Sequence, residues 1–290
     1  KYARSTLSLA QVRAVLNRIG WLNRGWARTV DDVSAFYQAL PEPTLRHLLN
    51  ALYQKKVAEH GAVRWGDKTP TYVRYIAELN DIFPTAQFVH LIRDGRDAAL
   101  SAEKKWGHRR WYMDDCYLLK SWVRNVEGGR KAGESLELNR YLEIQYEALV
   151  QRPERIVRRL CIFLREEFHP AMLDHTGLAR EQIGPQGHVE VRSPISTASV
   201  QRWKKEMSPF ARKMANRIAG PTLTATGYPL ADIPPLSPSE GLRLLSLWAK
   251  YRVTSAPREI LPKLGIPTLN RDKRKPGLRS AVRGMLSVDL

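Results

Sequence analysis

The first sixty residues carry apolar side chains at helical spacing. Residues 9–19 and 31–40 each show the apolar stripe of an amphipathic helix, and residues 44–59 place leucines and a valine on one face of a third. Residues 63–70 have the pattern of a short strand that enters a loop. We expect Thr69 to cap a helix that has Pro70 at its first position and ends near Pro84.

The middle of the chain alternates between strands and helices. Residues 87–92 form a nearly continuous apolar run, which is typical of a parallel strand buried on both faces, and residues 140–146 alternate as a second strand. Helices are predicted at 96–105, 114–132 and 153–164. Strands separated by helices of ten or more residues favour an α/β fold with a parallel sheet.

The last third of the chain is less regular. Residues 177–199 are rich in Gly, Pro and Ser, which predicts a loop, and a helix follows at 208–225. A proline-rich linker at 233–238 precedes a basic helix, and 267–290 has the composition of a disordered segment. We therefore expect a main domain over residues 1–232 and a basic C-terminal extension over 233–290.

The charge balance is strongly basic. The 290 residues contain 47 Lys and Arg against 29 Asp and Glu, a formal net charge of +18. Such an excess either keeps the protein in solution or meets an anion, for example a phosphate-rich ligand, nucleic acid or lipid headgroups. Apart from residues 271–275, the basic side chains are spread along the chain.

Cysteines and histidines exclude some classes of site. Cys116 and Cys161 are too few for a disulfide framework, although one bridge between them stays possible, and they fit a reducing compartment. The seven histidines show no zinc spacing, so we predict no metal. No apolar run reaches the length of a membrane span, and no signal peptide precedes the first helix pattern. We expect a cytoplasmic protein.

The run from Phe88 to Ser101 carries the candidate chemistry. An apolar strand ends at Arg93, and a helix that has Ser101 in its second turn follows. A guanidinium, a hydroxyl and the N–H groups of a helix start can together surround a phosphate. The neighbouring Asp94 and Asp97 allow a second interpretation, in which an Arg–Asp network only fixes the strand–helix turn. Spacing alone does not choose between the two.

Several motifs occur in an order that resembles a known family. The sequence resembles sulfotransferases that use 3′-phosphoadenosine 5′-phosphosulfate (PAPS), in particular the bacterial and tyrosylprotein-type branch. The motifs that carry this resemblance are Gly66-Asp67-Lys68-Thr69-Pro70, the run 83–101, Tyr146-Glu147-Ala148-Leu149 and Trp203-Lys204. The resemblance covers about residues 62–228. It implies a three-layer P-loop-type α/β fold with a central parallel sheet, and sulfuryl transfer from PAPS to a hydroxyl or amine acceptor.

The resemblance also implies roles for nucleotide-binding residues. Arg93 and Ser101 would hold the 3′-phosphate, and Tyr146 would contact the adenine, although a core tyrosine at a strand end is the simpler interpretation of that residue. Ser199 and Lys204 would belong to a loop that closes over the nucleotide phosphates. The expected product is 3′,5′-bisphosphoadenosine.

Two residues are candidates for the chemical step. Lys68 resembles the lysine that approaches the transferring sulfuryl group, where a fixed positive charge stabilises a loose, in-line transition state. His108, in the aromatic and basic segment 106–112, is a visible imidazole that could face the acceptor as a base. His90 lies inside the predicted strand and is better explained as structural.

One motif of the family does not occur in this sequence. A 5′-phosphosulfate loop of the type P-R-S-G-T-T is missing, and the glycine cluster at 128–133 lacks the features of a Walker A motif. The resemblance implies that the first strand, this loop and the general base precede Lys1. Activity requires that loop, so a catalytically degenerate scaffold with the same fold is one alternative.

The net charge and one amphipathic helix suggest partners that the family resemblance does not imply. The net charge suggests a nucleic-acid-binding protein as another alternative, but no nucleic-acid-binding motif is present, so we expect none as a partner. The acceptor would be a glycan, a lipid or a small molecule. The helix at 240–252 could touch an anionic membrane through Leu242, Leu245 and Trp248, or simply pack on its own domain.

Overall fold

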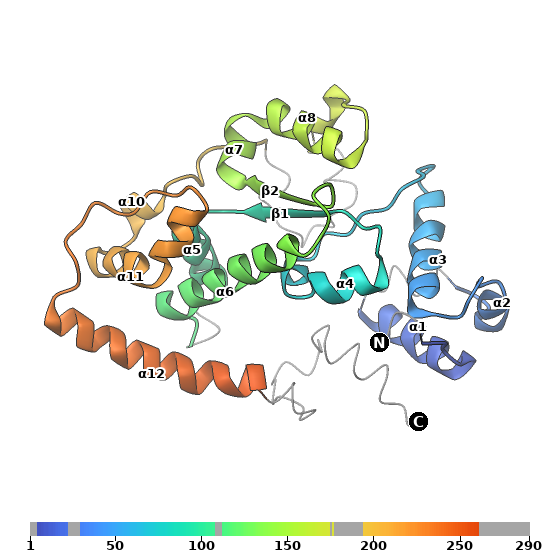
Figure 1. Cartoon of the computed structure of the whole chain (residues 1–290), viewed down its shortest axis with the longest axis horizontal. Coiled ribbons are helices and arrows are strands. Elements are labelled where there is room, and N and C mark those ends of the chain that lie inside the picture. The colour runs from blue at the N-terminus through green and yellow to red at the C-terminus, as the bar shows by residue number, and fades with distance from the viewer. Residues whose placement is uncertain (1–4, 23–29, 108–111, 175, 177–193, 261–290) are drawn as a thin grey trace. The chain divides into compact units, whose positions relative to one another are not determined.

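A computed structural model describes residues 5–22, 30–107, 112–174, 176 and 194–260 (Figure 1). The chain divides into two compact units. One comprises Lys1–Pro84 with Thr254–Leu290, and the other Thr85–Val253. The boundary expected between residues 232 and 233 stays a prediction, because a compact unit in space need not coincide with a sequence domain.

Unit 1, the unit with the N-terminal residues, is built from helices. They are α1 (Leu9–Leu22), α2 (Val33–Gln38), α3 (Leu45–Ala58), the 3-10 helix η1 (Pro70–Arg74) and α4 (Ile76–Ile82). Val12, Val15, Leu48 and Leu52 are almost completely buried in its core. The three helices expected before residue 60 are therefore confirmed, because their apolar stripes face one another.

Two expectations for residues 63–82 are wrong. Residues 62–69 form no strand, since side chains rather than backbone hydrogen bonds hold them, and Val63 is 91% exposed. The helix predicted from Pro70 is broken at Tyr75, whose φ of −130° and ψ of 19° are not helical. The Thr69 hydroxyl does not cap it, because it donates instead to Asp67 Oδ1, at 3.4 Å.

Unit 2, residues 85–253, contains the parallel strands β1 (Phe88–Ile92) and β2 (Tyr141–Gln145). Phe88 pairs with Tyr141, and the register continues to the pair Ile92 and Gln145. Between them run α5 (Gly95–Trp106) and α6 (Asp115–Glu134). The unit continues with α7 (Tyr146–Gln151), α8 (Pro153–Leu164), η3 (Pro170–Leu173), α10 (Trp203–Glu206), α11 (Pro209–Ala225) and most of α12 (Pro238–Ile260). The predicted α/β class is confirmed.

Helices lie on both sides of the strand pair, which gives the expected three layers. Figure 1 shows α7 and α8 on one side and α5, α6 and α11 on the other. The main core joins Ile92 of β1 to Leu119 of α6 and to Met214 and Leu223 of α11. It fixes the carboxyl end of β1, from which the candidate site begins.

The expectation that residues 87–92 are buried on both faces is wrong for this unit. Ile92 is 3% exposed, whereas Val89 is 42% and Leu91 50% exposed. Side chains alternate along a strand, so Val89 and Leu91 share one face of β1, and the helices of this unit cover that face only in part.

Three further features bear on the sequence analysis. Both cysteines are buried and free, so the bridge left open by the sequence does not form. No helix in the described part of the chain is long and apolar enough to span a bilayer. Within the same residues, no three His, Cys, Asp or Glu side chains gather into a group that could hold a metal ion.

Candidate nucleotide site

The turn from β1 to α5 is fixed by one side chain and one close approach. Asp94 is the N-cap of α5, and its carboxylate accepts from the backbone N–H of Arg96 at 2.9 Å. The Trp122 ring packs so closely on Gly95 that a Cβ there would lie 2.5 Å from a ring carbon. The indole N–H of Trp122 donates to the carbonyl oxygen of Arg93 at 2.9 Å. This turn therefore requires glycine at position 95.

Arg96 neutralises Asp94 inside the unit. Its Nε and Nη2 atoms donate to the two carboxylate oxygens at 2.9 and 2.7 Å, and the arginine is completely buried. The guanidinium also stacks on Trp203, with 3.7 Å from Cζ to the ring centroid. The Arg–Asp network considered from the sequence is therefore real, but it uses Arg96.

Arg93 has different partners. Its Nη2 donates to the backbone carbonyl of Ser199 at 2.7 Å, and its Cζ lies 4.9 Å from the centroid of the Tyr146 ring. Its Nε is buried and has no hydrogen-bond partner among the described residues. Ile92 pairs with Gln145, so Arg93 and Tyr146 are the next residues at the carboxyl ends of adjacent strands. The sheet register thus places a cation beside an aromatic ring.

Asp97 ties the segment before α10 to α5. Its Oδ1 accepts from the backbone N–H of Trp203 at 2.8 Å, whereas its Oδ2 is buried without a partner in the described structure. Burial raises the pKa of this carboxyl above its ordinary value, although the Trp203 amide opposes the shift. Arg93 and Asp97 together hold residues 199–203 over the start of α5.

Sequence reasoning missed Glu147 and Tyr228. Glu147 accepts from the backbone N–H of Asp94 at 3.0 Å through Oε1, and its Oε2 lies 2.6 Å from the Tyr228 hydroxyl. That hydroxyl also lies 3.1 Å from the carbonyl oxygen of Ile92. Glu147 follows Tyr146 in a noted motif, which is a usable signal. Nothing local in the sequence points to Tyr228, because its partners are far away along the chain.

The Lys68 loop in unit 1 is anchored by aromatic side chains. Tyr53 stacks on Trp65 with ring centroids 4.2 Å apart, and the hydroxyls of Tyr53 and Tyr72 both donate to Asp67 Oδ2. Burial and the Asp67 carboxylate raise the pKa of Tyr72 to about 12. Lys68 itself is exposed. The Asp67 carboxylate accepts hydrogen bonds from two tyrosine hydroxyls, and these bonds fix the backbone next to Lys68.

Comparison with known proteins adds the decisive observation. The model of the Sulfotransferase family matches residues 6–170, which is more than half of the 290 residues. The chain belongs to the sulfotransferase family. The matched range contains the turn from β1 to α5 and the Lys68 loop, so both lie inside the family region.

Curated relatives of this sulfotransferase chain are protein-tyrosine sulfotransferases. The one from Drosophila melanogaster is 24% identical over 237 residues, covering 77% of this chain and 47% of its own. Protein-tyrosine sulfotransferase 1 from Danio rerio is 26% identical over 239 residues, covering 76% and 65%. The chain thus spans about half to two thirds of these relatives. The sulfotransferase family expected from the motifs is confirmed, and the relatives that resemble the chain at this level of identity are of the expected tyrosylprotein type.

A solved structure, the sulfotransferase domain from the curacin biosynthetic pathway, aligns with a TM-score of 0.49 and 18% identity. The alignment covers 78% of this chain and 81% of that one.

The structure brings together only some of the predicted site residues of the sulfotransferase chain. Arg93, Tyr146 and Ser199 come together, although Ser199 contributes its carbonyl rather than its hydroxyl. Ser101 is half-buried on α5 and Lys204 is exposed on α10, and no contact joins either of them to Arg93 in the described structure. Lys68 belongs to the other unit. His108 lies outside the described residues.

Proposed function

We propose that this chain is a PAPS-dependent sulfotransferase that moves a sulfuryl group to a hydroxyl acceptor by in-line displacement. The observation that carries the proposal is the state of Arg93. Both arginines keep one buried nitrogen without a partner, but Arg96 is paired with the Asp94 carboxylate, whereas Arg93 lies beside the N-terminus of α5 with no carboxylate partner among the described residues. A guanidinium has five N–H donors, and the Ser199 carbonyl uses only one of those of Arg93. Such a group suits a phosphate.

The nucleotide site combines Arg93 with residues of the same unit. Arg93 and the Ser101 hydroxyl hold the 3′-phosphate, and the positive end of the α5 dipole favours that anion. The Tyr146 ring, already 4.9 Å from the guanidinium, contacts the adenine. Residues 199–204, which Arg93 and Asp97 hold in place, bring Ser199 and Lys204 toward the remaining phosphates.

Lys68 serves the transfer step. Bound PAPS supplies the sulfuryl group, and charge accumulates on its leaving oxygen. A lysine ammonium at that point stabilises the transition state more than the ground state, so Lys68→Ala lowers turnover and leaves nucleotide affinity nearly unchanged. We assign His108 as a candidate for the base that takes the acceptor proton.

The names of the relatives support one acceptor class as the first to test. They are named for protein tyrosine, so a tyrosine hydroxyl in a peptide is the first acceptor to test, before glycan, lipid and small-molecule hydroxyls. We also propose a cytoplasmic location, which the two free cysteines support, and peripheral contact with membranes through the segment around Trp248.

Calorimetric titration with nucleotides tests the proposal. We expect the chain to bind 3′,5′-bisphosphoadenosine at least tenfold more tightly than adenosine 5′-monophosphate. Arg93→Ala removes a charged partner of the 3′-phosphate, which costs about 2–5 kcal/mol, so affinity falls about thirtyfold or more and the preference disappears. Arg155→Ala, an exposed arginine on α8, is the control and keeps the preference. Equal affinity of the wild type for both nucleotides would overturn the assignment.

A further inference from the structure

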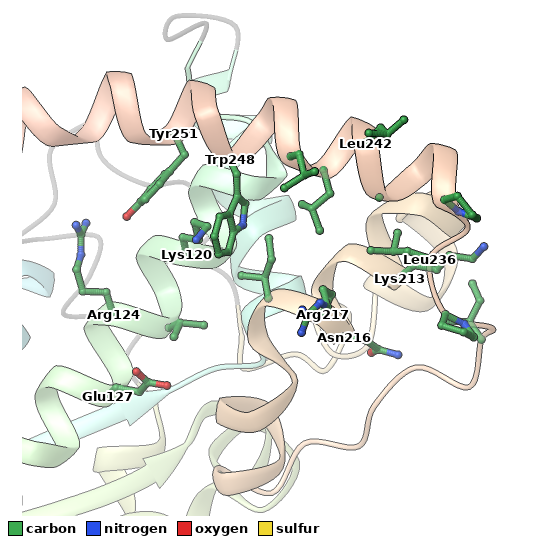
Figure 2. Close-up of a pocket in the computed structure, with 18 of the residues that line it drawn as sticks. Lys120, Arg124, Glu127, Lys213, Asn216, Arg217, Leu236, Leu242, Trp248 and Tyr251 are labelled. Carbon is green, nitrogen blue, oxygen red and sulfur yellow. The ribbon is translucent and has the colours of Figure 1, made fainter.

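Unit 2 contains a large groove on the side of α6 and α11 that α12 covers. Its volume is about 1260 Å³, and α6, α11, the linker before α12 and α12 itself form its walls (Figure 2). This volume exceeds the usual size of a small-molecule site. None of the residues of the proposed nucleotide site lines it, so it needs an explanation of its own.

The groove has an apolar interior that continues to the surface. Its lining includes Val123 of α6, Ile218 of α11 and, from α12, Leu245 and Trp248. Leu242 is 70%, Leu245 62% and Trp248 45% exposed. All three side chains line the groove. They form an apolar patch that this unit leaves uncovered, which marks an interaction surface.

Cationic side chains from two helices line the same groove. They sit at helical spacing, so each helix presents a row: Lys120, Arg124 and Lys131 on α6, and Lys213 and Arg217 on α11. Glu127 is the one acidic residue in the lining, and its carboxylate accepts a hydrogen bond from Thr222. Lys213 is paired with Glu240 at 3.0 Å. Even without Lys213 and Arg124, the cations Lys120, Lys131 and Arg217 outnumber Glu127, so the groove complements an anion.

Lys120 links the apolar and the cationic parts. Its Nζ lies 3.6 Å from the centroid of the Trp248 ring and 5.1 Å from that of Tyr251, and Figure 2 shows the indole pointing from α12 toward it. Burial lowers the pKa of this ammonium group. Aromatic rings with a polar edge, next to lysine, are typical of side chains at the boundary between hydrocarbon and water.

We propose that this groove binds anionic phospholipid at a bilayer surface, with an acyl chain along Val123 and Trp248 and the headgroup at the cation rows. The inference rests on the membrane contact proposed above and deepens it, because it assigns that contact a ligand and a site separate from the nucleotide. Leu242 and Leu245 favour a lipid phase over an acidic peptide. Both line the groove and yet stay 70% and 62% exposed, so a bilayer over the groove would cover area that a peptide bound inside it would leave in water.

Vesicle binding tests the proposal. Sedimentation of the 290-residue chain with phosphatidylcholine vesicles, with and without phosphatidylglycerol, measures the partition coefficient. We expect binding only to the vesicles that contain phosphatidylglycerol. Phosphatidylglycerol with brominated acyl chains should quench tryptophan fluorescence, and Trp248→Phe should remove most of that quenching. Binding to poly-glutamate without binding to these vesicles would show a peptide site instead.

Three groove variants separate lipid binding from general charge attraction. Lys131→Gln/Arg217→Gln removes two exposed cations, each worth about fivefold near an anionic surface, so partitioning falls about 25-fold. Leu242→Ser/Leu245→Ser lowers it at least tenfold. Gly128→Trp fills the groove, because the space around its absent Cβ is open. All three alter surface positions, so the circular dichroism spectrum stays unchanged.

The matched control is Arg155→Gln/Arg159→Gln, which removes two exposed charges from α8. It should change partitioning by less than twofold. If this pair lowered binding as much as Lys131→Gln/Arg217→Gln, or if the leucine pair and Gly128→Trp left binding unchanged, the groove would not be the lipid site. Each of these outcomes is independent of nucleotide affinity, so it leaves the sulfotransferase proposal untouched.

Discussion

Arg93 and Arg96 lie three residues apart and do different work. Arg96 is completely buried, makes a two-pronged ion pair with Asp94 and stacks on Trp203. Arg93 makes one hydrogen bond to a carbonyl and lies beside Tyr146. A buried arginine that holds an N-cap carboxylate belongs to the fold, whereas one at a strand end that bonds only to a carbonyl keeps its charge available for a ligand.

Unfolding in urea distinguishes the structural role of Arg96 from the proposed ligand-binding role of Arg93. Arg96→Ala leaves the Asp94 carboxylate buried without its partner, so the free energy of unfolding falls by about 3–5 kcal/mol. Arg93→Ala loses one charged hydrogen bond and costs about 1–2 kcal/mol. Nucleotide affinity should respond in the opposite order, provided Arg96→Ala is assayed where it is still folded. Equal losses of stability would mean that both arginines are structural.

Asp115 makes stability depend on pH. Burial, helped by the nearby carboxylates of Glu103 and Asp114, raises its pKa to about 6, against about 3.9 in an unfolded chain. Between these values the unfolded chain releases the proton and the folded one keeps it. The free energy of unfolding therefore falls as the pH rises from about 4 to about 6, by at most about 3 kcal/mol.

Asp115→Asn removes this titration. The difference in unfolding free energy between variant and wild type, followed in urea from pH 4 to pH 7, should shift in favour of the variant up to about pH 6 and then stay level. Asp232→Asn changes an exposed carboxyl and serves as control. A flat difference for Asp115→Asn would show that its carboxyl titrates alike in both states.

At the scale of an element, two glycines in helices report on packing. A Cβ on Gly95, at the start of α5, would meet the Trp122 ring at 2.5 to 2.9 Å, whereas a Cβ on Gly128 of α6 would meet nothing within 4 Å. Gly95→Ala should therefore cost about 1–3 kcal/mol of stability, because a close-packed helix start must move. Gly128→Ala should stabilise by about 0.5–1 kcal/mol. Thermal unfolding of both variants should show a lower melting temperature for Gly95→Ala and a higher one for Gly128→Ala. A stabilising Gly95→Ala would contradict the packing at this turn.

The elements also show what the sequence can predict. Helices with a clear apolar stripe, such as α3, α6 and α11, were predicted within a residue or two, because each buries that stripe. Residues 63–70 were predicted as a short strand that enters a loop, but no strand forms, since side chains from distant positions hold Trp65 and Asp67. Apolar content alone does not distinguish these cases.

In the candidate site, too, some contacts could be predicted from the sequence and others could not. The meeting of Arg93 and Tyr146 follows from parallel strands whose carboxyl ends share one edge of the sheet, so it was predictable from two motifs. The bond from Arg93 to Ser199 joins residues more than a hundred positions apart through a backbone carbonyl, which no side-chain pattern encodes. The same holds for Tyr228 beneath Glu147.

For the whole molecule, the net charge of +18 invites comparison with nucleic-acid-binding proteins. The family assignment and the local structure explain the charge differently. Arg96 is used inside the fold, Arg93 stands at the proposed nucleotide site, and two rows of cations line the groove under α12. A basic surface of this kind attracts any polyanion, but without a built site the attraction comes from released counterions and depends steeply on salt.

Binding as a function of salt therefore distinguishes the two explanations. We expect affinity for double-stranded DNA, measured by fluorescence anisotropy, to fall by orders of magnitude between low and physiological salt, with no dependence on sequence. Affinity for 3′,5′-bisphosphoadenosine should fall far less, because one partly buried guanidinium and a helix N-terminus meet a small ligand and few counterions are released. Arg93→Ala should abolish the nucleotide response and hardly change the DNA curve. Sequence-specific DNA binding that persists at physiological salt would favour a nucleic-acid function for this chain.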